Sequence, residues 1–433
     1  MFLGLSWGDD ILKRENGHYG EGLHTSLNPA QYEYMNQNDS VGTYIIEGAD
    51  LILPDAILPH ATLAVCEGRI VHIVADNESP FPAELIQSDP SFDGAPLIHV
   101  ADAFVAPSLV EMHIHGCGRW GFERLSGPED LVAAATFLET KGVGCCVPTI
   151  LWDEQAITLL VTAILASGLP RTIVPGIYLE GPFVNLAKRG GIQPECIRPP
   201  DPSLAQKILD AAQGLLKIVT LAPELDGVAH LYRIFQDAGV LVSLGHSDAT
   251  LESLAIPEHP YSMTHLFNAM RGIDHKEGGL ANLAFSQSPD YVELNGDGIH
   301  VNETCLRLGV RAILEDSLIL ISDAVIGAGL PHGTFRYYEH DVVSTERGVR
   351  YAETGVLMGS NRLGIDVVRN FASQAGVPLW QAVRAMSLVP RRALGMAKDY
   401  GSIEIGKVAD IFIWDKELEI ATKPEALLAG EAK

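Results

Sequence analysis

Two histidines separated by one residue, His113 and His115, lie in the apolar stretch VEMHIHGCG at residues 110–118. In a β-strand, residues i and i+2 project from the same face, so both imidazoles would point to one side. Gly116 and Gly118 then end the strand and let other groups come close to its backbone. An ordinary half-buried strand can carry the same pattern, so this segment alone leaves a metal site and a plain strand both open.

Five other polar residues each follow or end a different short apolar run. They are Glu180 in VPGIYLE, His246 in VLVSLGH, His265 in SMTH, His300 in GDGIH and Asp323 in LILISD. Taken singly, a glutamate at a strand end is often only solvated, and a buried imidazole is often satisfied by its neighbours. A buried carboxylate such as Asp323 needs either a partner or a catalytic role. Independent coincidence at strand after strand is a poor explanation of the pattern.

Imidazole and carboxylate groups in this number are typical of a hydrolytic metal centre that holds Zn²⁺ or Fe²⁺. We assign Glu180, His246 and His265 to one ion. His113 and His115 would hold a second ion, which Glu180 could share. The sequence leaves open whether one or two ions are bound.

The two remaining candidates would carry out proton transfer and stabilise charge. Asp323 would act as general base toward the attacking water and as acid toward the leaving nitrogen. His300 would polarise the substrate carbonyl and stabilise the oxyanion that forms from it. The chemistry expected of the whole set is hydrolysis of an amide.

The elements that would position these residues are read from the alternation of apolar runs with helical stretches. Runs such as CCVPTIL, KIVTLAPE and VELNGDGIH are short and almost continuously apolar, as buried parallel strands are. Counting from VEMHIHG gives about eight such units, the number that closes a (β/α)₈ barrel. The active site of that fold lies at the C-terminal ends of the strands, so the candidate residues would meet at the barrel mouth.

Both ends of the chain have a different pattern from the middle. Residues 41–106 read as short strands with turns, and the segment GSIEIGKVADIFIWDKELEI, which begins at Gly401, has the same alternation. A lone hairpin is unstable in water, so we expect the C-terminal segment to complete the sheet begun near the N-terminus. This predicts a β domain of residues 41–106 plus 399–433 and a barrel of residues 107–398. Residues 1–40 are polar and aromatic and are expected to form an N-terminal extension.

The composition limits the classes of partner. A chain of 433 residues with 47% hydrophobic and 20% charged residues is typical of a globular protein with a sizeable core. Its formal net charge of −25 should repel nucleic acid and anionic membranes, and an anionic substrate would need a local basic pocket. The sequence contains no apolar run of about 18 residues, and its first residues reach charged side chains after only a few apolar ones. Neither a membrane span nor a signal peptide is therefore expected. Six scattered cysteines fit reduced thiols, so a cytoplasmic location is expected.

Several longer motifs resemble the amidohydrolase superfamily and, within it, the N-acetylglucosamine-6-phosphate deacetylase family. They are HIHGCG, LEGPFVNLAKRGG, TLAPE, GHSDAT, THLFNAM, DGIH, SDA, LMGS and GSIEIGKVADIFIWD. The resemblance runs from about residue 41 to the end. It implies a distorted (β/α)₈ barrel with a split β-sandwich, a Zn²⁺ or Fe²⁺ centre, a homodimer and the roles already assigned to the metal and proton-transfer residues.

The same resemblance implies substrate contacts and reveals departures from the family pattern. Asn268 and Ala269 would contact the sugar and the phosphate. Where the family usually has a substrate-contacting histidine, this chain has Ile192 followed by Gln193. The position of the family's phosphate-binding arginine is occupied by Lys276, which can hold phosphate as a point charge but without a bidentate fork. Nearby Arg271 could supply the missing guanidinium, although both cations can also be read as ordinary surface charges.

The resulting prediction is hydrolysis of the acetamido group of N-acetylglucosamine 6-phosphate to glucosamine 6-phosphate and acetate. A second hypothesis keeps this chemistry for a galacto epimer, an unphosphorylated amino sugar or another N-acyl amine. A non-catalytic scaffold is disfavoured because none of the expected ligands is missing. A cyclic-amide hydrolase is disfavoured because Glu180, rather than a lysine, stands at the bridging position.

Overall fold

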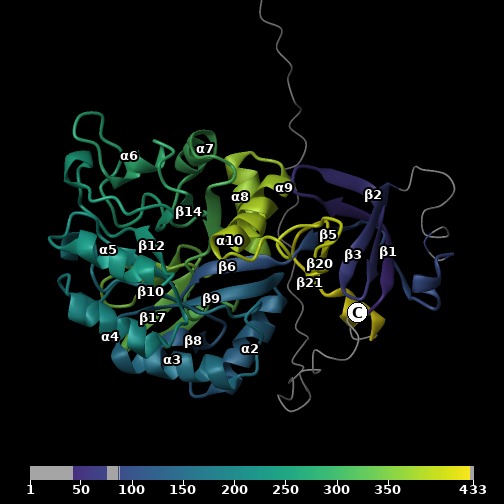
Figure 1. Ribbon diagram of the computed structural model, residues 1–433, viewed down its shortest axis with the longest axis horizontal. Helices are drawn as coiled ribbons and strands as arrows, with labels where there is room; N and C mark the ends of the chain where they lie inside the picture. The colour runs from purple at the N-terminus through teal and green to yellow at the C-terminus, as the bar shows by residue number, and fades with distance from the viewer. Residues whose placement is uncertain (1–41, 76–85, 87, 430–433) are drawn as a thin grey trace, which may run out of the picture. The chain divides into compact units, whose positions relative to one another are not determined.

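The structure is a computed structural model, and it describes residues 42–75, 86 and 88–429. The predicted N-terminal extension, residues 1–40, lies outside the described residues. Eight parallel strands form the largest sheet, in the order β15-β14-β13-β12-β11-β10-β9-β6 (Figure 1). Their bounds are β6 Leu109–Ile114, β9 Val143–Leu151, β10 Ile177–Glu180, β11 Leu216–Leu221, β12 Leu241–Leu244, β13 Tyr261–Met263, β14 Tyr291–Asn295 and β15 Leu318–Ile321.

The two edge strands of this sheet meet at their C-terminal ends. The backbone N–H of Asp323, just after β15, donates to the carbonyl of His113 in β6 at 3.1 Å. The N–H of His115 donates to the carbonyl of Ala324 at 2.7 Å. These bonds bring the first and last strands together and confirm the predicted eight-stranded barrel.

Helices pack around the strands, and their sequences show why they form. In α3, Glu154–Ala166, the carboxylate of Asp153 accepts hydrogen bonds from the first free N–H groups of the helix. Its buried apolar residues recur at helical spacing, at 157, 160, 161 and 164. The other helices are α2 Pro128–Glu139, α4 Pro202–Ala212, α5 Val228–Asp237, α6 Leu280–Ala284, α7 Glu303–Ala312, α8 Ile365–Ala375, α9 Leu379–Met386, α10 Leu388–Ala393 and α11 Pro424–Leu428.

The alternation of strand and helix is not regular throughout the barrel. Between β12 and β13 there is only a 3₁₀ turn, Leu251–Ser253, and the helix between β13 and β14, α6, has five residues. Long loops therefore replace helices beside the strands that end near His246 and His265. The distortion implied by the family resemblance falls on this side of the barrel.

Strands from both ends of the chain form a second, seven-stranded sheet, as expected. In Figure 1 the purple N-terminal strands and the yellow C-terminal strands lie together in it, and β20 runs antiparallel to β5. The strands are β1 Tyr44–Ile52, β2 Ile57–Cys66, β3 Arg69–Ala75, β4 Leu97–His99, β5 Ala103–Pro107, β20 Ile411–Asp415 and β21 Ala421–Thr422. The domain boundaries proposed from the sequence stay a prediction.

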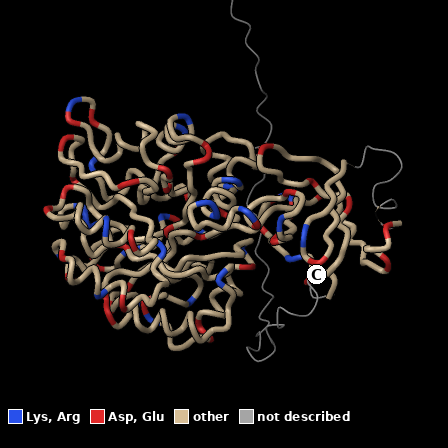
Figure 2. The backbone as a smooth tube through the Cα atoms, viewed as in Figure 1, with Lys and Arg blue, Asp and Glu red and all other residues tan. Residues whose placement is uncertain are grey.

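A four-stranded antiparallel sheet follows β15 and was not predicted from the sequence. It consists of β16 Gly333–Tyr337, β17 His340–Thr345, β18 Gly348–Tyr351 and β19 Leu357–Gly359. Lysine and arginine are interspersed with aspartate and glutamate along the described chain (Figure 2). None of the helices in the described ranges is long and apolar enough to cross a membrane.

Candidate metal centre and active site

A cavity of about 190 Å³ lies where the C-terminal ends of the barrel strands converge. Its lining residues come from at least six different strands or strand ends, as the barrel topology requires. They are His115, Leu151, Glu180, Gly190, Gly191, Ile192, His246, His265, Asn268, Ala269, His300, Asp323, Tyr337, Leu357 and Met358. His113 lies beneath this surface and is fully buried. The structure therefore gathers all seven of the strand-end candidates in one place.

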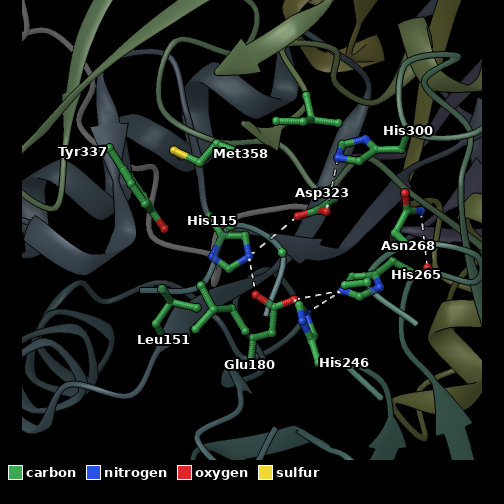
Figure 3. Close-up of a pocket in the computed structure, with 15 residues that line it drawn as sticks. His115, Leu151, Glu180, His246, His265, Asn268, His300, Asp323, Tyr337 and Met358 are labelled. Carbon is green, nitrogen blue, oxygen red and sulfur yellow. Dashed lines mark hydrogen bonds and ion pairs between the residues drawn. The ribbon is translucent and has the colours of Figure 1, made fainter. Parts of the chain in front are cut away.

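Glu180 lies at the centre of the cluster (Figure 3). Its Oε1 is 2.9 Å from Nε2 of His246 and 3.0 Å from Nε2 of His265, and these two nitrogens are themselves 3.0 Å apart. Burial by itself would raise the pKa of Glu180, but the charge of His246 and hydrogen bonds from the histidines hold it well below its ordinary value. The carboxylate at the centre of the cluster is therefore ionised.

The first-strand histidines approach the same carboxylate from the other side. Nε2 of His115 is 3.4 Å from Oε2 of Glu180, and Nε2 of His113 is 3.6 Å from Oε1. Two groups of potential ligands thus share Glu180, one with His113 and His115, the other with His246 and His265. This arrangement can hold one divalent ion or two.

Hydrogen bonds behind the imidazoles test whether the cluster suits a metal ion. Nδ1 of His246 is 2.9 Å from the carbonyl oxygen of Lys188, which can only accept, so Nδ1 carries a proton and a metal ion that replaced the proton on Nε2 would meet the lone pair there. Nδ1 of His113 likewise lies 3.0 Å from a carboxylate oxygen of Glu293, while its buried Nε2 has no hydrogen-bond partner among the described residues. Lone pairs that converge on one carboxylate need a cation between them, so the donor set fits a divalent metal.

Glu293 also controls the charge of His113. Burial lowers the pKa of His113, but the charge and hydrogen bond of Glu293 outweigh burial and raise it to about 9. Burial is also the largest influence on the pKa of His265, and it lowers that pKa below its ordinary value. A divalent cation can take the place of the proton that His113 otherwise carries on Nε2. Glu293 was not recognised from the sequence, although its position in a buried strand (VELN) marks a carboxylate that needs a partner.

Asp323 and His300 lie beside the cluster, within reach of a shared substrate. Oδ1 of Asp323 is 3.6 Å from Nε2 of His115, and its Oδ2 is 3.6 Å from Nε2 of His300. Nδ1 of His300 is 2.9 Å from Oδ2 of Asp297, which is fully buried. Burial lowers the pKa of His300, but the charge of Asp297 and its hydrogen bond raise it overall. Asp297 stands in the DGIH motif, and its role as the partner of His300 was missed in the sequence.

The backbone at the site departs from ordinary geometry. Four site residues that are not glycine have positive φ, and they are His246 (48°), His265 (30°), Ala269 (48°) and Asp323 (53°). Such conformations are costly and persist where the surrounding structure enforces them, most often at functional sites. At Asp323 the backbone is held on both sides, because its N–H bonds to the carbonyl of His113 and its own carbonyl accepts from the N–H of Ser360 at 2.9 Å.

The residues expected to bind substrate divide into two groups. Asn268 and Ala269 line the cavity. Arg271 and Lys276 do not line it, and the guanidinium of Arg271 pairs instead with Asp248 at 3.4 Å and Glu277 at 3.0 Å. Lys276 is exposed on the loop before α6. Among the described residues that line the cavity there is no lysine or arginine.

The altered loop noticed in the sequence forms part of the cavity wall. Ile192 is buried and lines the cavity, while Gln193 turns away and donates from Nε2 to the hydroxyl of Tyr351 at 2.7 Å. The same hydroxyl donates to the carbonyl of Gly191 at 3.0 Å. Two hydrogen bonds to β18 therefore fix the loop that carries Ile192.

The chain is similar to known proteins in sequence and in structure. Residues 104–432 match the model described as the Amidohydrolase family. The chain is 31% identical to N-acetylglucosamine-6-phosphate deacetylase of Mus musculus, over 73% of this chain and 80% of that protein. It is 28% identical to N-acetylgalactosamine-6-phosphate deacetylase of Escherichia coli O157:H7, over 87% of this chain and 97% of that protein.

A solved structure shows the same likeness in three dimensions. The crystal structure of N-acetyl-D-glucosamine-6-phosphate deacetylase from Mycobacterium smegmatis is 28% identical and has a TM-score of 0.75. The match covers 88% of this chain and 97% of that chain. The chain therefore belongs to the amidohydrolase family and, within it, to the N-acetylglucosamine-6-phosphate deacetylase family.

Proposed function

We propose that this protein is a metal-dependent deacetylase that hydrolyses the acetamido group of N-acetylglucosamine 6-phosphate in amino-sugar catabolism. The products would be glucosamine 6-phosphate and acetate. The observation that carries the proposal is the convergence of four imidazoles on Glu180, with Asp323 and His300 on one side of the same cavity. A metal centre, a proton carrier and an oxyanion donor in one cavity are a combination that can hydrolyse an unactivated amide.

Glu180, His246 and His265 would hold one ion, and His113 and His115 would hold a second ion together with Glu180. Their nitrogen and oxygen atoms suit Zn²⁺ or Fe²⁺, and we propose one or two ions per subunit. When bound, such an ion supplies Lewis acidity that makes water nucleophilic near neutral pH. The hydrogen bonds from His113 to Glu293 and from His246 to Lys188 keep the ring orientations fixed for that task.

Asp323 and His300 would carry the proton transfers. Asp323, between His115 and His300, accepts the proton of the attacking water and passes it to the amide nitrogen as the carbon–nitrogen bond breaks. His300, held through Nδ1 by Asp297, donates from Nε2 to the carbonyl oxygen as negative charge develops there. Both groups face the cavity from the same side, so one bound amide can contact both (Figure 3).

Recognition of the sugar and its phosphate is assigned to Asn268, Ala269, Arg271 and Lys276. The first two line the cavity, which supports contact with the sugar. The two cations lie on the loop that leads away from it, so we propose that they meet a phosphate at the rim rather than inside. The guanidinium of Arg271 already has two carboxylate partners, which makes Lys276 the better candidate for the charge contact.

A second candidate function is deacetylation of the galacto epimer. The likeness to the Escherichia coli N-acetylgalactosamine-6-phosphate deacetylase, at 28% identity over 87% of this chain, supports it. An unphosphorylated amino sugar is a related alternative, supported by the lack of a cation among the lining residues. These alternatives keep the catalytic groups and change only the binding contacts.

Acetate release distinguishes these functions. Purified protein loaded with Zn²⁺ or Fe²⁺ would be assayed with N-acetylglucosamine 6-phosphate, its galacto epimer and unphosphorylated N-acetylglucosamine. We expect the highest kcat/KM for the first and loss of activity after chelation. A higher kcat/KM for either of the other two compounds would identify that compound as the better substrate. If none of the three released acetate, the deacetylase proposal would be refuted.

We also propose, from the family resemblance and the composition, that the protein is a cytoplasmic homodimer. Sedimentation velocity at micromolar concentration would test the assembly, and fractionation of the producing cells would test the location. A purely monomeric species would refute the proposed homodimer.

A further inference from the structure

One polar side chain of the cavity has no part in the chemistry described above. Tyr337 is the last residue of β16 and is 3% exposed, yet its side chain lines the cavity. In Figure 3 its hydroxyl points inward, on the side of His115 and away from His300. No described residue is hydrogen-bonded to this hydroxyl. Its oxygen is also not completely buried, so a molecule in the cavity can reach it. It is a free donor and acceptor that faces the cavity.

The wall around Tyr337 is otherwise apolar. Leu151, Ile192 and Met358 line the cavity, and Figure 3 places Leu151 and Met358 on the same side as Tyr337. Leu151 and Ile192 belong to one buried cluster, against which the ring of Tyr338 packs. Asn268 and His300 lie on the other side of the cavity in the same view. The side of Asn268 and His300 is therefore polar, and the side of Tyr337 is apolar apart from His115 and the tyrosine hydroxyl.

A strained turn presents Tyr337 to the cavity. Tyr337 pairs with His340 across a two-residue hairpin turn, and the turn residues Tyr338 and Glu339 have φ of 42° and 71°. Turns of this kind favour asparagine and glycine, because other residues are strained at positive φ. Ion pairs from Glu339 to Arg124 and Arg336 and the edge-on contact between the rings of Tyr337 and Tyr338, with centroids 4.6 Å apart, hold the turn. A strained conformation beside an active site points to a functional requirement.

The two sides of the cavity fit the two ends of an N-acyl amino sugar. The sugar carries many hydroxyls and needs polar partners, so it belongs on the side of Asn268 and His300. The acyl group is small and apolar next to its carbonyl, so it belongs against Leu151, Ile192 and Met358. With the nitrogen at Asp323, the acyl group then lies toward Tyr337.

We propose that Tyr337 determines which acyl group is removed, and that its hydroxyl binds an acyl group carrying a hydroxyl on the carbon next to the carbonyl. In a glycolyl group, the carbon next to the carbonyl carries such a hydroxyl. An apolar wall alone would disfavour the glycolyl hydroxyl, because burying a hydroxyl without a partner is costly. This inference rests on the proposed deacetylase function.

The test compares two substrates in two variants and the wild type. kcat/KM would be measured for N-acetyl- and N-glycolylglucosamine 6-phosphate with wild-type protein, Tyr337→Phe and Tyr338→Phe. In Tyr337→Phe we expect kcat/KM for the glycolyl substrate to fall about tenfold, mainly through KM, and that for the acetyl substrate to change less than about twofold. Tyr338→Phe is the matched control, since it removes a hydroxyl from the same turn, and there we expect an unchanged ratio.

The outcomes separate the acyl-recognition proposal from the function on which it rests. If wild-type protein releases acetate but Tyr337→Phe leaves the glycolyl-to-acetyl ratio unchanged, or lowers both rates equally, the acyl assignment is overturned while the deacetylase proposal stands. If the wild type hydrolyses neither substrate, both fail. Unchanged melting temperatures of the variants would show that an altered ratio does not come from misfolding.

Discussion

Replacing Asp297 by asparagine tests whether a buried carboxylate sets the catalytic state of His300. Asp297 is fully buried, and its Oδ2 lies 2.9 Å from Nδ1 of His300. Its Oδ1 accepts the backbone N–H groups of Ile299 and His300 at 3.0 and 3.1 Å. Because Oδ1 is fixed by these bonds, an asparagine would turn its NH₂ group toward Nδ1 and remove the acceptor that holds the imidazole.

The expected loss follows from the interaction removed. A hydrogen bond to a charged group contributes roughly 1.5–3 kcal/mol, so kcat/KM should fall by about 10- to 150-fold if His300 stabilises the transition state. Asp297 raises the pKa of His300 and keeps it protonated to higher pH. Without the carboxylate this protonated form is lost at lower pH, so the alkaline limb of the pH profile should move downward.

Acetate release across pH measures both effects, and the same strand supplies a control. At the opposite end of β14, Asp290 accepts from Nδ1 of His259 at 2.7 Å on the surface. Asp290→Asn makes the same chemical change and should leave kcat/KM and its pH profile unaltered. A kcat/KM for Asp297→Asn within twofold of the wild type, with an unmoved alkaline limb, would refute the role given to His300.

Four further substitutions have defined outcomes. Glu180→Gln removes the ligand that both groups of histidines share, so metal retained after dialysis, measured by elemental analysis, should fall more than about tenfold; full retention would contradict the shared site. Lys276→Ala should raise KM for the 6-phosphate substrate about fivefold and leave KM for the unphosphorylated sugar unchanged, whereas Arg271→Ala should have the smaller effect; no change in either variant would exclude phosphate contact by that residue. Burial raises the pKa of Glu123 to about 7, so its ionisation opposes folding as pH rises through that value. Glu123→Gln should therefore match the wild type in free energy of unfolding near pH 4.5 and exceed it by up to about 3 kcal/mol above pH 8, a gain that denaturant titration would detect or disprove.

The barrel was predictable because buried parallel strands leave a strong pattern in the sequence. Each of its eight strands is a short, almost continuously apolar run, and strand topology then brings the strand ends together. Glu180, His246 and Asp323 could be found in this way because each stands at the end of such a run. The four-stranded sheet was missed because strands such as β16 are only half-buried and lack a continuous apolar run.

The residues that orient the site were harder to find than the residues that form it. Glu293 supports His113 from a strand 180 residues away, and no spacing rule predicts that pairing. Ser322 and Gly364 likewise donate to Glu111, and together they fix the strand end that carries Asp323. Such partners are set by tertiary packing, so they become visible only when the strands are placed side by side.

The groups for hydrolysis and the groups for substrate recognition stand on different parts of the structure around one cavity. The groups for hydrolysis stand at the C-terminal ends of barrel strands or a few residues beyond them, and the hydrogen bonds between neighbouring strands fix those ends. The groups that would choose the substrate stand on added parts, namely Ile192 on a loop fastened by Tyr351, Lys276 on the loop before α6, and Tyr337 on a strained hairpin. Such loops and hairpins can change without disturbing Glu180 and its histidines. Departures of this chain from the family pattern therefore bear on which acyl amino sugar is bound, and the catalytic steps should be the same for each.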